Sequence, residues 1–139
     1  MRTLFIILFS LITLNVFPNF DDYFSFKTLR LDYFRTGNHE TEIISIDELI
    51  EEPFWGGSKT KLFDQFDYGN HKFEVYEYLN NILIYSNTYC SLFNEWQTTA
   101  EAKETWRTFN ESIVFPFPLQ KVNVVFYTRD YKNEWIEKF

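Results

Sequence analysis

The sequence predicts an all-β protein, an antiparallel β-sandwich or barrel with one short helix crossing between strands. Two observations lead to this fold class. Aromatic residues make up 22% of the 139-residue chain, and flat side chains favour the pleated surface of a sheet. Short runs of alternating apolar and polar residues are separated by turn-forming residues about every 8–12 positions, as in sandwiches.

The expected strands follow in order along the chain. The first alternates Leu29, Leu31 and Tyr33 with charged residues, as a half-buried strand does. Prolines 116 and 118 cannot donate ladder hydrogen bonds, so their strand is expected at a sheet edge. Asn80 and Asn81 suit a hairpin turn, because asparagine tolerates left-handed backbone angles. The seven expected strands are residues 27–34, 41–46, 71–78, 82–86, 111–118, 121–128 and 134–139.

Two other segments are expected to lack regular structure. Residues 47–57 form an acidic bend that ends in Pro53 and two glycines, and residues 61–70 form a loop. The segment between the fourth and fifth strands is rich in helix-forming residues, and its Thr98-x-x-Glu101 matches a capping box. The sequence therefore predicts a helix over residues 99–108. Its Trp106–Phe109 face is interpreted as core cover, with an aromatic ligand platform as the alternative.

Composition and charge exclude several classes of function. The length is that of one domain. The net charge is -7 and the 13 basic residues are scattered, whereas binding to nucleic acid or an anionic membrane surface needs clustered lysine and arginine. A single cysteine excludes an internal disulfide and a cysteine-rich zinc site. Cys90 is expected to be a small buried apolar residue.

The N-terminus has the pattern of a secretory signal. Residues 4–17 form an apolar run of 14 residues after a short basic start, too short to span a bilayer. No small-residue cleavage motif follows. We expect export to the periplasm, cell surface or medium, with a signal-peptide-like segment at 1–18 and a β-sandwich domain at 19–139. The alternative is a retained hydrophobic segment.

Catalytic and metal sites find weak support. His39-Glu40 opens a segment that resembles H-E-x-x-H, but Ile43 replaces the second histidine, and His71 is the only other histidine. Zinc therefore has too few ligands. A nucleophilic pair of Cys90 with either histidine has nothing to mark the thiol as activated. No cofactor and no catalytic residue are predicted.

Two sets of acidic residues are further candidate sites. Asp64, Asp67 and Asn70 could hold a structural calcium ion, but a solvated loop is favoured because their spacing is not that of a calcium loop. A larger set is interpreted as a soluble face, with paired glycosidase carboxylates as the sharper alternative. Its members are Glu40, Glu42, Asp47, Glu48, Glu51 and Glu52.

The four tryptophans are the candidate binding or interface residues. They are Trp55, Trp96, Trp106 and Trp135. Aromatic rings on a sandwich surface can stack on sugars, and a large exposed aromatic patch marks a binding site. The alternative is that they fill the core or cover an interface.

Several ordered motifs resemble one family, the N-terminal domain of the bacterial secreted IgA peptidases. The motifs span about residues 20–135, in the family's order and at similar spacings. They are "TLRLDYFRTGN" (28–38), "PFWGG" (53–57), "SLFNEWQTTAEAKETW" (91–106), "PFP" (116–118) and the Arg129-Asp130 turn.

Members of that family are secreted zinc metallopeptidases. The resemblance implies an immunoglobulin-like sandwich placed ahead of a catalytic domain, and a mature chain that starts near Phe20. It implies a non-catalytic accessory domain whose partner is that catalytic domain or a host or extracellular protein. The family's zinc helix has no counterpart here, and the last strand looks clipped at Phe139. The alternative function is a stand-alone exported module that binds glycans or proteins, a reading by fold-level analogy.

Overall fold

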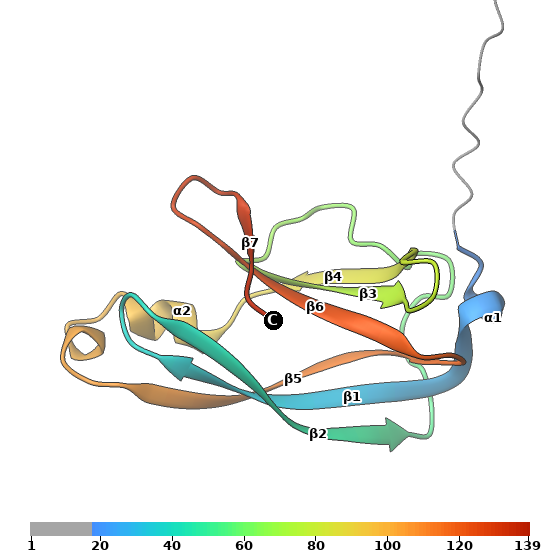
Figure 1. The fold of residues 1–139 in the computed structure, drawn as a ribbon, viewed down its shortest axis with the longest axis horizontal. Coiled ribbons are helices and arrows are strands. Elements are labelled where there is room, and N and C mark those ends of the chain that lie inside the picture. The colour runs from blue at the N-terminus through green and yellow to red at the C-terminus, as the bar shows by residue number, and fades with distance from the viewer. Residues whose placement is uncertain (1–17) are drawn as a thin grey trace, which may run out of the picture.

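The computed structural model describes residues 18–139, which form a two-layer sandwich (Figure 1). Seven strands and three short helical segments follow one another along the chain. In order they are α1 (Phe20–Tyr23), β1 (Phe24–Gly37), β2 (Glu42–Glu52), β3 (His71–Glu77), β4 (Leu83–Tyr89), α2 (Leu92–Gln97), η1 (Glu101–Lys103), β5 (Arg107–Pro118), β6 (Val122–Arg129) and β7 (Trp135–Glu137). The predicted all-β sandwich is confirmed.

Each layer is an antiparallel sheet. Sheet A has the order β2-β1-β5, and sheet B has the order β4-β3-β6-β7. In sheet A the central strand is the first strand of the chain. The 14-residue β1 therefore pairs along most of its length with both neighbours.

Three connections cross between the layers. Residues 53–70 lead from β2 to β3, the α2–η1 segment leads from β4 to β5, and a short turn joins β5 to β6. In Figure 1 the α2–η1 crossing and the β5–β6 turn lie at opposite ends of the sandwich. Phe73, Tyr85 and Phe115 pack against one another between the sheets, with ring centroids 5.8–6.4 Å apart.

The expected strands are all present, and some are longer than predicted. The strand that starts near residue 41 continues through the expected acidic bend to Glu52, because Glu48–Glu52 still pair with β1. β5 pairs only with β1, so its predicted edge position is confirmed. The β3–β4 turn is confirmed as well, with Asn81 at a φ of 54°. Glu77 closes this turn by accepting bonds from the backbone N–H groups of Leu79 and Asn80.

The predicted helix over residues 99–108 is wrong. The helix is α2, whose N-cap is Ser91: its hydroxyl accepts a bond from the N–H of Phe93 at 3.0 Å. Thr98 ends this helix, and only the three-residue η1 follows. Trp106 and Phe109 consequently lie outside any helix, Phe109 within β5. Ser91 is the cap in place of Thr98 because its hydroxyl also bonds to Glu111 of β5. Sequence periodicity does not reveal this contact.

Two further expectations concern Cys90 and the apolar N-terminal segment. Cys90 is exposed, so the expectation of a buried thiol is wrong. It directly follows β4, in the connection that leaves sheet B. The signal-peptide-like segment lies outside the described residues except for Pro18. Within residues 18–139 no helix has the length and apolar character needed to cross a membrane.

Candidate functional site

The four candidate tryptophans occupy different surroundings. The Trp55 ring packs edge-on against Tyr85 at 6.0 Å and is partly buried. Trp96 is only 6% exposed and forms a small second core with Phe93 and Ala102. Trp106 is 51% exposed.

Trp135 on β7 is covered by a neighbouring cation. The Arg129 guanidinium lies 3.8 Å from its ring centroid, and its Nε1–H donates to Asp67 at 3.2 Å. The structure does not gather the four indoles into one patch, and Trp106 presents the most exposed of the rings.

The polar residues converge instead on a buried arginine. Arg35 on β1 is fully buried, and its guanidinium reaches side chains of both sheets. We call this set the Arg35 cluster. It comprises Tyr33, Arg35, Glu42, His71, Tyr89, Glu111 and Thr128, from β1, β2, β3, β4, β5 and β6. A hydrogen-bonded network thus ties together six of the seven strands.

Two carboxylates balance the arginine. Glu42 pairs with Arg35 Nη1, and Glu111 accepts a bond from Arg35 Nε at 2.9 Å. Burial alone would raise the pKa of Glu111, but the Arg35 charge and the Ser91 and Tyr33 hydroxyls outweigh it and lower that pKa. Lys138 Nζ lies 3.4 Å from Glu42. The charges therefore cancel when the histidine of the cluster is neutral.

His71 is held neutral by its neighbours. Arg35 Nη1 lies 3.0 Å from His71 Nδ1, and because a guanidinium only donates, Nδ1 must accept and Nε2 must carry the proton. Burial, and then the Arg35 charge, lower the pKa of His71 to about 4. Nε2 and the Oδ1 atom of Asn94 are both buried without a hydrogen-bond partner within the described chain. The donor without a partner thus belongs to β3, and the acceptor without a partner belongs to α2.

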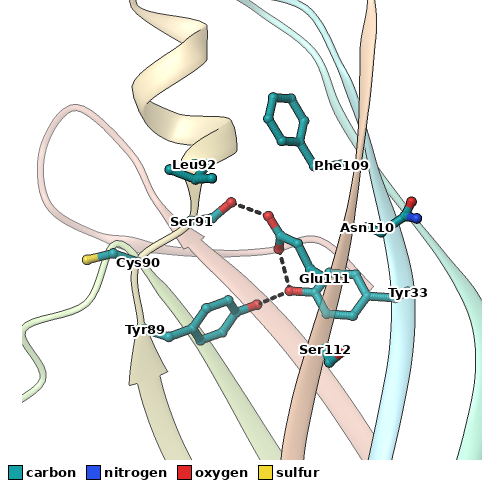
Figure 2. Close-up of a pocket in the computed structure, with 9 residues that line it drawn as sticks. All are labelled: Tyr33, Tyr89, Cys90, Ser91, Leu92, Phe109, Asn110, Glu111 and Ser112. Carbon is teal, nitrogen blue, oxygen red and sulfur yellow. Dashed lines mark hydrogen bonds between the residues drawn. The ribbon is translucent and has the colours of Figure 1, made fainter.

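A pocket of about 250 Å³ opens beside the cluster, between the β4–α2 connection and β5 (Figure 2). Figure 2 shows Ser91 and Tyr33 both bonded to Glu111, and Tyr33 bonded to Tyr89. Both carboxylate oxygens of Glu111 are therefore occupied. The Cys90 sulfur points away from this carboxylate. The pocket presents no activated nucleophile or free base.

A second hollow lies on the open side of the sandwich, where β2 faces β6 and the chain after β7. Its volume is about 470 Å³, and we call it the open groove. Its lining is Leu31, Ile46, Leu49, Val122, Asn123, Val124, Val125, Glu137 and Phe139. Most of these side chains are apolar, and Leu49 is 61% exposed. Sheet B therefore leaves part of the inner face of β2 uncovered.

Comparison with protein families gives a match over residues 19–139, to the family described as Peptidase M64 N-terminus. That range contains every described strand. The chain belongs to the peptidase M64 N-terminal family. The resemblance to the N-terminal domain of IgA peptidases is confirmed at this level. No curated protein matches the chain.

The M64 peptidases are expected to use zinc, but the residues of this M64 N-terminal domain do not fit it. Among the described residues no group of three or more His, Cys, Asp or Glu side chains could hold a metal ion. His39 lies in an exposed turn beside Glu40, while His71 is in the core. No step of zinc chemistry can be derived for these residues.

The candidate calcium ligands Asp64 and Asp67 already form hydrogen bonds within the M64 domain. Asp64 accepts bonds from the Thr88 hydroxyl and from the N–H of Phe66. Asp67 accepts from Arg129 and Trp135 at 2.9 and 3.2 Å. These contacts pin the 53–70 connection onto sheet B.

Sequence reasoning missed the Arg35 cluster. It placed Glu42 on a soluble acidic face, which is wrong, because that side chain is buried against Arg35. The alternation Leu31, Tyr33, Arg35 could have revealed that the arginine points inward. Ending the first strand at residue 34 removed that signal.

Proposed function

We propose that this M64 N-terminal domain is a non-catalytic accessory domain of a secreted, metallopeptidase-like protein, with a structural and interaction role. The observation that carries the proposal is the family match, which is to an N-terminal domain and spans residues 19–139. The partner we propose is a metallopeptidase catalytic domain. We also propose export through the apolar segment at 1–18.

Two features of the side chains support an interaction role. The ionisable groups of the Arg35 cluster bond to one another, and so they hold the two sheets together. Apolar side chains stand exposed along the open groove instead. Exposed apolar surface of this kind marks contact with another protein.

The experiment combines association with activity. The purified full chain is mixed with the separately purified catalytic domain of an M64 peptidase, and sedimentation velocity follows complex formation. We expect a one-to-one complex, and no hydrolysis of casein or of fluorogenic peptides by the chain alone when zinc is added. Peptide hydrolysis by the chain alone that a chelator abolishes would refute the non-catalytic role. A lack of any complex would refute the accessory role.

A further inference from the structure

Strand β2 is the least protected edge of the sandwich. On β4, Ser86 exchanges two backbone hydrogen bonds with Leu62 and Asp64, at 3.0 and 3.1 Å. On β5, prolines 116 and 118 interrupt the row of donors. β7 has three residues. β2 has 11 residues without proline, and within residues 18–139 its only strand partner is β1. Unpaired backbone groups of such an edge are a template for another strand.

The side chains of β2 also favour the addition of a strand at this edge. Leu49 pairs with Leu31, and Ile46 pairs with Tyr33, so all four point toward sheet B. Leu31 and Tyr33 are buried there, yet Ile46 is 37% exposed, and Leu49 is more exposed still. The core therefore continues past β1 onto positions that no described residue covers. An added strand beside β2 would place its own inward side chains over the open groove.

Charge identifies what kind of strand fits. Asp47 and Glu48 lie at the exposed edge and form no ion pair with any residue in 18–139, and the chain's net charge is -7. Glu48 pairs with Asp32, a position that points away from sheet B. A second copy of β2 would bring carboxylates against carboxylates. Like charges opposite one another destabilise a strand pair, whereas opposite charges stabilise it.

We propose that β2 and the open groove bind an extended polypeptide segment that alternates apolar residues with lysine or arginine, added as a fourth strand to sheet A. The apolar side chains enter the open groove beside Ile46 and Leu49. The basic side chains lie on the outer face, near Glu48. Asp47 is the extra residue where the β1–β2 register shifts, and the incoming strand pairs on either side of it. This deepens the proposed accessory role, on which it rests for the identity of the partner protein.

The test uses the full chain and a fluorescein-labelled nine-residue peptide of alternating valine and lysine. Fluorescence anisotropy measures its affinity. Three control peptides have the valines grouped together, glutamate in place of lysine, or N-methylated amides at alternate positions. We expect all three controls to bind at least about tenfold more weakly, since each removes one element of strand addition.

Matched variants locate the site. Leu49→Ser should weaken peptide binding by about tenfold, equivalent to about 1.4 kcal/mol. Val114→Ser alters an exposed apolar residue on the other edge of the same sheet and should leave the affinity unchanged. Glu48→Gln should weaken binding and reduce its salt dependence, whereas Glu104→Gln should not. Hydrogen exchange of the complex should show added protection in β2.

Several results would overturn the proposal. These are equal binding of the grouped-valine peptide, an unchanged affinity in Leu49→Ser, no binding of the alternating peptide at millimolar concentration, or a dimer of the chain that protects β2 without peptide. If the peptide fails but the M64 catalytic domain still associates, this inference falls and the accessory role stands. If the peptide binds at β2 but the catalytic domain does not associate, the accessory role falls alone.

Discussion

Arg35 on β1 and His71 on β3 meet across the core of the sandwich, with Arg35 Nη1 3.0 Å from His71 Nδ1. The contact joins the central strand of sheet A to a central strand of sheet B. The same guanidinium forms ion pairs with Glu42 and Glu111, so one side chain contacts polar groups from both layers. Stability of the domain should therefore depend strongly on this residue.

Replacing Arg35 should strongly destabilise the domain, because its side chain is fully buried on the central strand of sheet A. Arg35→Met removes the cation, so the buried Glu111 loses its ion-pair partner and Glu42 keeps Lys138 alone. We expect a loss of about 3–5 kcal/mol in the free energy of unfolding. Urea denaturation followed by circular dichroism measures it. Arg30→Met, on the same strand but with partly exposed partners, is the control and should change little. Equal effects of the two substitutions would argue against a structural role for the cluster.

Acid should destabilise the fold through His71. Its pKa is about 4 in the folded chain and 6.5 ordinarily, so between these values the unfolded chain binds more protons. Stability is thus complete above about pH 6.5 and is lost as the pH falls toward 4. Since a tenfold change in proton affinity is about 1.4 kcal/mol, the loss amounts to about 3 kcal/mol.

Burial of the His71 ring, and then the charge of Arg35, set the sign of that effect. Arg35 opposes its protonation, while Glu42 and Glu111 favour it more weakly. His71→Asn keeps an acceptor near the Nδ1 position and should flatten the profile of unfolding free energy between pH 6.5 and 4. His39→Asn, in the exposed turn, should retain the wild-type profile. A wild-type slope in His71→Asn would assign the acid sensitivity to other groups.

Gly37 should not accept a side chain. A Cβ there would lie 1.9 Å from the carbonyl oxygen of Thr41 and 2.9 Å from the Phe93 ring, whereas a Cβ at Gly56 meets nothing within 4 Å. We expect Gly37→Ala to cost about 1–3 kcal/mol, as overpacking does. Gly56→Ala should be neutral or slightly stabilising. Thermal unfolding of both variants distinguishes a steric constraint at Gly37 from a general need for glycine.

The tryptophans should separate into structural and surface residues. Trp96→Ala removes a buried ring that contacts Phe93 and Phe109, and donates from Nε1 to Glu101 at 3.2 Å. We expect it to cost about 3–5 kcal/mol. Trp106→Ala should stay within about 0.5 kcal/mol, because that side chain is largely exposed. Chemical denaturation read by circular dichroism avoids dependence on tryptophan fluorescence. Comparable losses would place Trp106 in the core.

The strands could be predicted because each carries its own alternation. Leu29, Leu31 and Tyr33 show the inward face of β1, and prolines 116 and 118 mark an edge. The position of α2 could not be predicted, because Thr98–Glu101 offers an equally good local cap. The choice of Ser91 depends on Glu111, which is distant in sequence but adjacent in the fold.

The Arg35 cluster and the open groove could not be predicted for a similar reason. Each is built from strands that are far apart in the chain, and sequence alone does not give the order β2-β1-β5 opposite β4-β3-β6-β7. Glu42 resembles its acidic neighbours in sequence, but its register opposite Gly37 turns it inward. Leu49 is an apolar residue on the inner face of β2, and the incomplete cover of that face leaves it exposed.

The most direct test of the account is hydrogen exchange on the full chain, with and without the catalytic domain of an M64 peptidase. An interaction role through the open groove predicts slowed exchange in β2 and in β6, with little change at the pocket beside Glu111. Unchanged exchange throughout, or slowing confined to the β4–α2 connection and β5, would contradict it.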